Sequence, residues 1–483
     1  MSTVPASIEA AYDPEAFRTS GHRLIDALGD ALARWHRRDG VVLPWRTPDE
    51  ALAVWSRKGF GGGDLVDDMR RVMAASTALA HPRCMAHQVP PPLPGATLAE
   101  LVSALLNNGM AIYEMGPAAV PIELAVIAWM AEKLGMSPES AGGVLTSGGS
   151  LGNLTALLAM RQAHAGFDVW KEGAHAGPPL AVLSSSDAHY SVARTLRIMG
   201  WGNDGVVPVP VDARHRMTAQ ASAAVLAQAR AARPERRIVG IVAAAGSTAT
   251  GAFDPLDELA DLAAREGLWL HVDAAHGGGA AMSEAQRHKL RGIERADSVV
   301  WDAHKLLMMP ALITAVLFKD GSHAYEAFAQ QASYLFANAA PEETWYDLGT
   351  RTLECTKRAM AIEVWSTLRV HGEQLFGDII DRLVGLAGEL AARVVAAPDF
   401  ELALVPELNI VCYRHRPAGI APGPALDAHN RALRQRVVED GRFYIVGTQL
   451  PGGYHLRSTI MNPLSEPTDF DDLISHLRVL SQP

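Results

Sequence analysis

The sequence predicts an α/β protein whose main sheet is mostly parallel and which carries a second, smaller α/β domain. Short apolar runs recur along the middle of the chain, at 181–183, 238–242, 268–272, 298–301 and 313–318. Helical stretches such as 154–164 and 256–265 separate several of these runs. Short, wholly apolar strands that alternate with helices are typical of a parallel sheet covered on both faces. Because 483 residues exceed what one hydrophobic core usually holds, at least two domains are expected.

The remaining elements follow from local patterns. Apolar residues at helical spacing predict an amphipathic helix over 15–36, and a proline-rich stretch at 89–95 interrupts regular structure. One long helix is expected over 357–371. A second unit, beginning near 375, is expected to hold helices at 379–395 and 426–439 and strands at 408–413, 443–446 and 455–460. We therefore predict an N-terminal helical arm (1–85), a large domain (86–365) and a small C-terminal domain (366–483).

Composition and charge exclude several classes of function. Lys and Arg number 43 against 53 Asp and Glu, a net charge of −10 with no basic run, which argues against nucleic acids and anionic membranes as partners. The longest apolar run, at 308–318, is too short to span a bilayer, and residues 1–17 show no secretory signal. Cys84, Cys355 and Cys412 form no CxxC pair, which favours a reducing compartment. A cytoplasmic protein is therefore expected.

A lysine with apolar neighbours is the first candidate for chemistry. Lys305, in the segment 300–307 (VWDAHKLL), follows a predicted strand. Apolar flanks desolvate an ammonium group and lower the pKa of a lysine, and a neutral lysine forms a Schiff base with an aldehyde. A single lysine of this kind is more often a surface residue, so its interpretation depends on the motifs that accompany it.

A carboxylate at a strand end is the second candidate. Asp273, in the segment 270–278 (LHVDAAHGG), ends an apolar strand, where a carboxylate is costly without a cationic partner. A protonated pyridine nitrogen would be such a partner, and a helix cap or a structural ion pair is the alternative.

Two further segments complete the set. Gly148, Gly149 and Ser150 precede a helical pattern, where backbone N–H groups and the helix dipole bind an oxyanion, although a simple small-residue turn is the alternative. His189 follows the strand at 181–183 and is placed to stack on an aromatic ligand, or to serve as a structural histidine.

Together these segments supply the contacts that pyridoxal phosphate requires, in order along one sheet. With them, the chain resembles the pyridoxal-phosphate group II amino-acid decarboxylases, which include glutamate, aromatic-amino-acid, cysteine-sulfinate and 2,4-diaminobutyrate decarboxylases. The resemblance runs from 81–83 (HPR) to 456–457 (LR). It implies a fold-type-I, aspartate-aminotransferase-like enzyme that acts as a homodimer and releases carbon dioxide from an amino acid.

The resemblance also implies the residues that bind the cofactor. Lys305 would bind it covalently, Asp273 would pair with the ring nitrogen, and His189 would stack on the ring; these three are the implied catalytic residues. The full implied cofactor set is Gly148, Gly149, Ser150, His189, Thr248, Asp273, Ala275, His304 and Lys305. No metal is implied.

Substrate choice is expected to depend on residues outside this set. The resemblance implies that Arg457 holds the α-carboxylate of the substrate. His87 and Gln88 stand where the family often has aromatic residues, and His276 follows Asp-Ala-Ala in place of an aromatic residue. A small polar or charged L-amino acid, such as 2,4-diaminobutyrate or glutamate, is therefore expected.

One departure from the family leaves alternatives open. Many members carry a tyrosine on a mobile loop that returns a proton to the substrate. Here ungapped counting over 334–355 places Glu342 there, with Tyr346 nearby, and the mobile loop is expected at about 333–350. A decarboxylating aldehyde synthase, a carbon–carbon lyase or an aminotransferase on the same scaffold thus stays open. A remote alternative is a metallohydrolase that uses His271, Asp273 and His276 as metal ligands.

Overall fold

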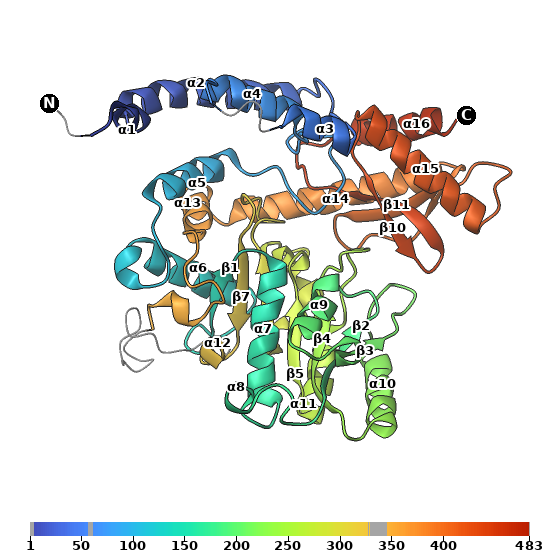
Figure 1. Cartoon of the computed structure of the whole chain (residues 1–483). Coiled ribbons are helices and arrows are strands. Elements are labelled where there is room, and N and C mark those ends of the chain that lie inside the picture. The colour runs from blue at the N-terminus through green and yellow to red at the C-terminus, as the bar shows by residue number, and fades with distance from the viewer. Residues whose placement is uncertain (1–3, 57–60, 327, 329–344, 483) are drawn as a thin grey trace. The chain divides into compact units, whose positions relative to one another are not determined.

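The computed structural model describes residues 4–56, 61–326, 328 and 345–482 (Figure 1). The chain divides into a larger compact unit, residues 88–388 and 404–410, and a smaller one, residues 1–87, 389–403 and 411–483. This division differs from the three expected parts, because residues 1–87 group with the C-terminal segments and residues 366–388 belong to the larger unit. No described helix combines the length and the apolar character that a bilayer span requires.

The larger unit is built on a seven-stranded sheet with the order β1-β7-β6-β5-β4-β2-β3. Its strands are β1 (Gly142–Thr146), β2 (Leu180–Ser185), β3 (Val206–Val209), β4 (Arg237–Ala244), β5 (Trp269–Asp273), β6 (Ser298–Asp302) and β7 (Thr314–Phe318). The pairs β2/β3, β2/β4, β4/β5 and β5/β6 are parallel, whereas β7 runs antiparallel to both β1 and β6. The prediction of a mainly parallel sheet is therefore confirmed.

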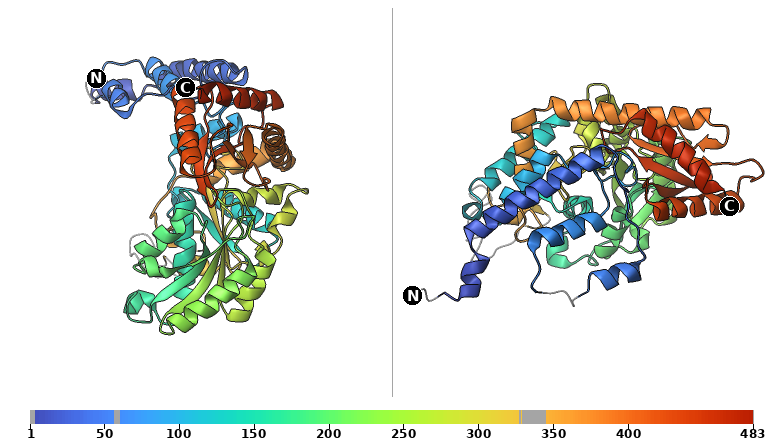
Figure 2. Two further views of the ribbon diagram at one scale, coloured as in Figure 1. Left: turned by 90° about the vertical axis from the view of Figure 1, so that its right-hand side faces the viewer. Right: turned by 90° about the horizontal axis from the view of Figure 1, so that it is seen from above.

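Helices cover both sides of this sheet, as the left panel of Figure 2 shows. They are α5 (Pro94–Leu106), α6 (Ala119–Lys133), α7 (Gly149–His164), α8 (Val169–Glu172), α9 (Tyr190–Ile198), α10 (Ala219–Ala232), α11 (Leu256–Glu266), α12 (His323–Glu326) and α13 (Ala361–His371). Short 3₁₀ helices are η2 (Tyr113–Met115), η3 (Asn203–Gly205), η4 (Gly277–Met282), η5 (Arg287–Leu290), η6 (Ile293–Arg295) and η8 (Leu348–Thr350). The long helix α14 (Gln374–Ala396) contains residues of both units.

Helix α7 is held unusually close to the sheet. Its buried Leu157 and Met160 join Val300 of β6 in one apolar core. Near its start, a Cβ atom on Gly152 would lie 3.1 Å from the Thr314 side chain and 3.3 Å from that of Val300. The absence of a side chain at Gly152 therefore lets the first turn of α7 approach the sheet.

A buried ion pair covers the outer edge of β1. Lys357 donates to Glu123 of α6 and to the carbonyl oxygen of Leu145, and the Leu145 N–H donates to Glu123 at 2.9 Å. The side chains of Glu123 and Lys357 are each 1% exposed. Both backbone groups of Leu145 on this edge are thus satisfied by side chains rather than by another strand.

The smaller unit combines helices with a four-stranded sheet of order β10-β11-β9-β8. Its strands are β8 (Phe400–Leu402), β9 (Ile410–His415), β10 (Val446–Leu450) and β11 (Gly453–Thr459), and the pairs β10/β11 and β8/β9 are antiparallel. Its helices, besides the end of α14, are α1 (Ala6–Ala11), α2 (Pro14–His36), α3 (Pro48–Val54), α4 (Leu65–Ala75), α15 (Pro424–Asp440) and α16 (Pro467–Ser481).

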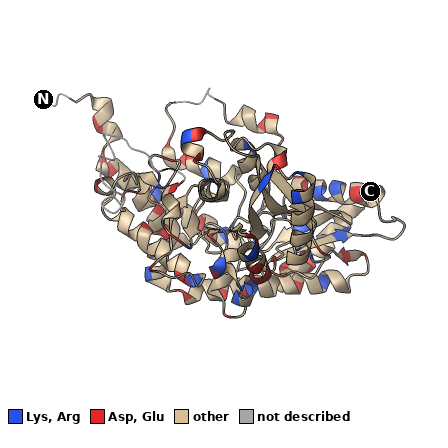
Figure 3. Ribbon diagram, turned by 90° about the horizontal axis from the view of Figure 1, so that it is seen from below, with Lys and Arg blue, Asp and Glu red and all other residues tan. Residues whose placement is uncertain are grey.

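An ion pair links the two ends of the chain within the smaller unit. Arg38, just after α2, donates to both carboxylate oxygens of Asp469 in α16, at 2.8 and 2.9 Å. Asp469 is 1% exposed, and Arg83 also contacts it, at 3.4 Å. Elsewhere basic and acidic residues are interspersed along the helices, with both colours on most of them in Figure 3.

Two expected element boundaries are wrong. The helix expected over 357–371 begins only at Ala361, because Lys357 is held by the ion pair at the edge of β1. The strand expected at 443–446 begins at Val446 and ends at Leu450, while Tyr444 forms only an isolated bridge with Cys84. These local apolar patterns therefore mark buried positions without marking strand pairing.

Candidate active site

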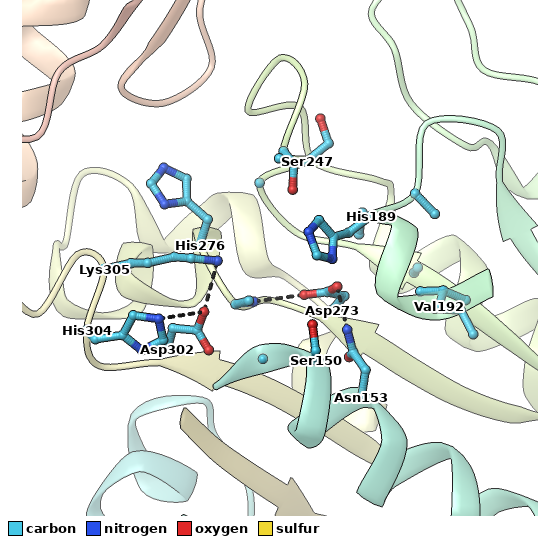
Figure 4. Close-up of a pocket in the computed structure, with 18 residues that line it drawn as sticks. Ser150, Asn153, His189, Val192, Ser247, Asp273, His276, Asp302, His304 and Lys305 are labelled. Atoms are coloured by element: carbon cyan, nitrogen blue, oxygen red, sulfur yellow. Dashed lines mark hydrogen bonds and ion pairs between the residues drawn. The ribbon is translucent and has the colours of Figure 1, made fainter. Parts of the chain in front are cut away.

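A pocket of the larger unit lies at the carboxyl ends of β4, β5 and β6, the edge at which ligands bind in open α/β sheets (Figure 4). Most of the residues predicted to bind a cofactor line it: Gly149, Ser150, His189, Thr248, Asp273, Ala275, His304 and Lys305. Of the predicted set, Gly148 alone is not among the lining residues, since it caps α7 immediately before them.

The glycine turn forms the wall of the pocket at the start of α7. Gly148 has φ of 106°, a left-handed conformation that favours glycine, and it is the N-cap of the helix. Ser147 donates to Glu354 at 2.5 Å, which fixes the turn from outside the pocket. The N-terminus of this sixteen-residue helix therefore lines the pocket at Gly149 and Ser150, where the helix dipole favours an anionic group such as a phosphate.

Asp273 ends β5 and faces the pocket. Its Oδ2 accepts from the Asn153 Nδ2 at 2.9 Å, and its Oδ1 accepts from the Ala275 N–H at 3.2 Å. Both bonds stabilise the ionised carboxylate, which suits a protonated ring nitrogen as its partner.

His189 caps the N-terminus of α9 and lies above Asp273 in Figure 4. Its Nδ1 accepts from the Ser191 N–H at 3.3 Å and lies 2.7 Å from the Ser191 hydroxyl. Burial lowers the pKa of His189, and the nearby charge of Asp273 only partly opposes this effect. A neutral imidazole therefore faces the pocket.

Lys305 has a carboxylate partner that the sequence pattern did not indicate. Its Nζ lies 2.9 Å from Oδ2 of Asp302, which is 1% exposed and also accepts from the Thr314 hydroxyl at 2.5 Å. His304 Nε2 lies 3.6 Å from the same oxygen. Burial alone would raise the pKa of Asp302, but the charges of Lys305 and His304 outweigh it, so that this pKa lies below its usual range. The lysine is thus paired as well as desolvated.

Two functional groups of the pocket, Asp302 and Asn153, were not predicted, although both lie within the sequence motifs described above. Asp302 stands three residues before Lys305, and Asn153 stands four residues after Gly149 on α7. Their signals were the uncompensated charge at the end of β6 and the helical spacing that returns Asn153 to the face of Gly149.

His276 lines the pocket near Lys305 in Figure 4. Its Nε2 lies 2.7 Å from Asn409 Oδ1, so Nε2 carries the proton. The residue is 2% exposed and gives the pocket a polar wall.

Arg457, His87, Gln88 and Tyr346, the predicted substrate and loop residues that the structure describes, are not among those that line this pocket. Arg457 is buried in the smaller unit, where burial lowers the pKa of its guanidinium, and it donates to the Ala86 carbonyl oxygen at 3.3 Å. His87 contacts the Tyr444 hydroxyl at 3.1 Å in the same unit, and Gln88 is buried in the larger one. Tyr346 packs edge-on against Tyr113.

Glu342 lies outside the described residues, as does most of the loop expected over 333–350.

The geometry does not favour the alternative of a metal site formed by His271, Asp273 and His276. Both ring nitrogens of His271 contact protein groups, Ser298 Oγ at 2.8 Å and Asn153 Oδ1 at 2.9 Å. Among the residues that the structure describes, no three His, Cys, Asp or Glu side chains are grouped so that they could hold a metal ion.

Comparison with known proteins agrees with this chemistry. A sequence model described as the pyridoxal-dependent decarboxylase conserved domain matches residues 62–416. Cysteine sulfinic acid decarboxylase of Mus musculus is 31% identical over 470 residues, which cover 94% of each chain. L-2,4-diaminobutyrate decarboxylase of Rhizobium meliloti (strain 1021) is 33% identical over 399 residues, covering 82% of this chain and 77% of that one.

The fold agrees as well. The crystal structure of mouse CSAD in its apo form superposes with a TM-score of 0.89 at 28% identity, covering 97% of this chain and 100% of that one. The family match spans most of the chain and includes every residue that lines the pocket. The chain therefore belongs to the pyridoxal-dependent decarboxylases, which makes it a carboxy-lyase that uses pyridoxal phosphate.

Proposed function

We propose that this decarboxylase acts on a small acidic or diamino L-amino acid, and that the described pocket is where it does so. The observation that carries the proposal is that Asp273, His189 and Lys305 line one pocket together with the N-terminus of α7. When bound there, pyridoxal phosphate supplies a ring that accepts the electron pair left as carbon dioxide departs.

Each residue of the pocket has its own proposed role. Lys305 would hold the cofactor covalently and later exchange with the amine of the substrate. Asp273, which accepts from Asn153 and from the Ala275 N–H, would pair with the ring nitrogen of the cofactor. His189 and Ala275 would contact the ring, and Thr248 would lie beside it.

Gly148, Gly149 and Ser150 receive the phosphate at the N-terminus of α7, with His304 nearby. Because Asp302 is buried beside this turn, its negative charge must stay compensated when Lys305 is engaged covalently. The Thr314 hydroxyl donates to Asp302 at 2.5 Å, and His304 Nε2 lies 3.6 Å from it, so both groups stay beside this carboxylate.

The substrate class is supported by the polar wall of the pocket and by the relatives. His276 lines the pocket and gives it a polar group, whose ring is held by Asn409. The relatives are named for cysteine sulfinate, for acidic amino acids and for L-2,4-diaminobutyrate. For the α-carboxylate we propose Arg457, with His87 and Gln88 as further substrate contacts.

A panel of amino acids tests this proposal. Carbon dioxide release is expected from cysteine sulfinate, glutamate, aspartate or 2,4-diaminobutyrate, with an equal amount of amine and no ammonia. Tryptophan and phenylalanine serve as controls of the same chemistry and should be poor substrates. Release from the aromatic substrates alone would overturn the substrate class, and stoichiometric ammonia would instead indicate aldehyde synthesis.

We also propose a homodimer in the cytoplasm. Helix α5 exposes an apolar row whose members are each about half exposed or more: Leu98, Leu101, Val102, Leu105 and Leu106. Contiguous apolar surface of this kind usually marks a protein interface, and a second copy of the chain is the occupant we propose. The three cysteines are free thiols, which suits a reducing compartment.

Light scattering tests the dimer. The expected mass is twice the chain mass of 51.7 kDa, and Leu105→Lys on α5 should lower it toward that of one chain. Val479→Lys places the same charge at an exposed apolar position on α16 and should leave the mass unchanged. A wild-type protein that stays monomeric at assay concentration would refute the dimer.

A further inference from the structure

We propose that Asn153 is a positioning residue that holds Asp273 and His189 as one hydrogen-bonded unit, and that His271 fixes the orientation of Asn153. The inference rests on the proposed function only in assuming that Asp273 and His189 face the cofactor. The hydrogen bonds on which the inference is argued all join residues of this chain, and none involves the cofactor.

The orientation of Asn153 follows from its partners. Its side chain is buried in the first turn of α7, with Nδ2 2.9 Å from Asp273 Oδ2 and 2.9 Å from Ser191 Oγ. A carboxylate oxygen only accepts, so the atom that faces Asp273 must be the amide nitrogen. Both Nδ2 protons are then used, and Oδ1 is left to accept from His271.

His271 is held so that it can only donate toward Asn153. Its Nε2 lies 2.9 Å from Asn153 Oδ1, an acceptor, so Nε2 carries the proton. Its Nδ1 lies 2.8 Å from Ser298 Oγ, which accepts the Trp269 indole N–H at 2.9 Å and gives its own proton to Nδ1. Burial lowers the pKa of His271 to about 4, which keeps the ring neutral, as this pattern requires.

The other arm of the network reaches His189 through Ser191. The Ser191 backbone N–H can only donate, and it points at His189 Nδ1 at 3.3 Å. The Ser191 hydroxyl accepts from Asn153 and therefore donates to the same Nδ1, at 2.7 Å. His189 is thus held in the tautomer with its proton on Nε2.

The side-chain amide of Asn153 therefore positions two groups of the pocket, Asp273 and His189. Asn153 lines the pocket, and it acts on these groups through Asp273 on one side and through Ser191 on the other. Because every donor in the chain from Trp269 to His189 is used, rotating the Asn153 amide would disrupt both arms at once.

Nuclear magnetic resonance of the holoenzyme, with ¹⁵N-histidine and a ¹⁵N-labelled cofactor ring, tests the inference. The wild type should show His189 as one neutral tautomer and a protonated ring nitrogen. Asn153→Leu should change both signals and weaken cofactor binding about tenfold, the effect of one lost hydrogen bond to a charged group. Ser191→Ala should raise the fraction of the other His189 tautomer while disturbing the cofactor nitrogen much less.

Ser298→Ala supplies a variant remote from the pocket in case Asn153→Leu fails to fold. Without the Ser298 proton, His271 is free to change tautomer, and the cofactor nitrogen signal should shift in the same direction as in Asn153→Leu, by less. Unchanged signals in both Ser298→Ala and Ser191→Ala, or equal disturbance of both signals by Ser191→Ala, would overturn the proposal.

A failure of the proposed function can be distinguished from a failure of this inference about Asn153. A wild-type protein that gives no cofactor adduct at Lys305 would contradict the roles proposed for the pocket. The His189 tautomer would still be measurable on the cofactor-free protein, and so would its change in Ser191→Ala.

Discussion

At the scale of single residues, the amine of Lys305 lies 2.9 Å from a carboxylate that has almost no contact with solvent. A buried charge without a partner is costly, so Asp302 and Lys305 stabilise each other. Thr314 and His304 complete the surroundings of Asp302. The lysine is therefore positioned before any cofactor arrives.

Lys305→Ala should abolish turnover, because no amine remains to bind the cofactor covalently. Reduction with borohydride followed by mass spectrometry should place the cofactor on Lys305 in the wild type and nowhere in the variant. Lys289→Ala is the matched control, since Lys289 is a half-buried lysine bonded to Gln286 and should keep both the adduct and the activity. Retained turnover by Lys305→Ala would contradict the assignment.

Asp254 should make stability fall as pH rises toward neutrality. Burial raises its pKa to about 7, although the N–H groups of Ala244 and Met217 donate to it. The folded carboxyl keeps its proton between pH ~4 and 7, where the unfolded one has lost it, so the free energy of unfolding decreases across that window by about 4 kcal/mol. Above pH 7 this contribution is lost.

Urea denaturation at several pH values checks this slope, which Asp254→Asn should remove. Asp257→Asn is the control: the bonds from Arg291 and Arg295 lower the pKa of Asp257, so it does not titrate in that window. The same slope in the wild type and in Asp254→Asn would count against the assignment.

Most of the cofactor-binding residues of the pocket could be predicted from the sequence. The residues that hold them in place, Asp302 and Asn153, could not. Asp273, His189 and Lys305 follow strand ends, where the sequence alone places side chains at one edge of the sheet. Asn153 acts through Asp273, Ser191 and His271, which are distant in sequence, whereas Asp302 lies in the same motif as Lys305 and its pairing depends on the turn that follows β6. The apolar neighbours of Lys305 in the sequence indicated that its side chain is largely buried, but they gave no indication of its ion pair with Asp302.

At the scale of elements, the contact of α7 with β6 and β7 depends on the missing side chain at Gly152. Gly152→Val should destabilise the protein by roughly 1–3 kcal/mol, because the added carbons meet the Thr314 and Val300 side chains. Displacing the first turn of α7 should also weaken cofactor binding. Gly385→Ala on α14, where a Cβ would meet nothing within 4 Å, should instead stabilise by about 0.5–1 kcal/mol.

Urea unfolding and fluorescence titration of the cofactor measure both effects. Equal stability changes in the two glycine variants would show that α7 can move away from the sheet without cost.

The fold was predictable where the pattern was strong. The central strands β4, β5 and β6 are buried on both faces and read as apolar runs, and α11 shows a clear apolar stripe. The short strand β3 contains Pro208, and β8 has only three residues, so both lack the length that makes a pattern visible. The position of β7 antiparallel between two parallel strands depends on pairing, which local sequence does not encode.

At the scale of the whole molecule, residues near both ends of the chain fold together in the smaller unit through Arg38 and Asp469. Arg38→Met should leave buried Asp469 with the weaker contact to Arg83 and the Glu466 N–H, and cost roughly 2 kcal/mol. The variant should also expose α2 to limited proteolysis. Arg37→Met is the control, because the ion pair of Arg37 with Asp39 lies at the surface and both side chains are exposed. Identical proteolysis rates in the two variants would contradict this role.

The ion pair of Glu123 and Lys357 has a consequence for how copies of the protein can meet. With the outward N–H and C=O of Leu145 already engaged, β1 presents no open ladder to an incoming strand. Sheet extension and the fibrous aggregation that follows from it are thereby blocked along this side.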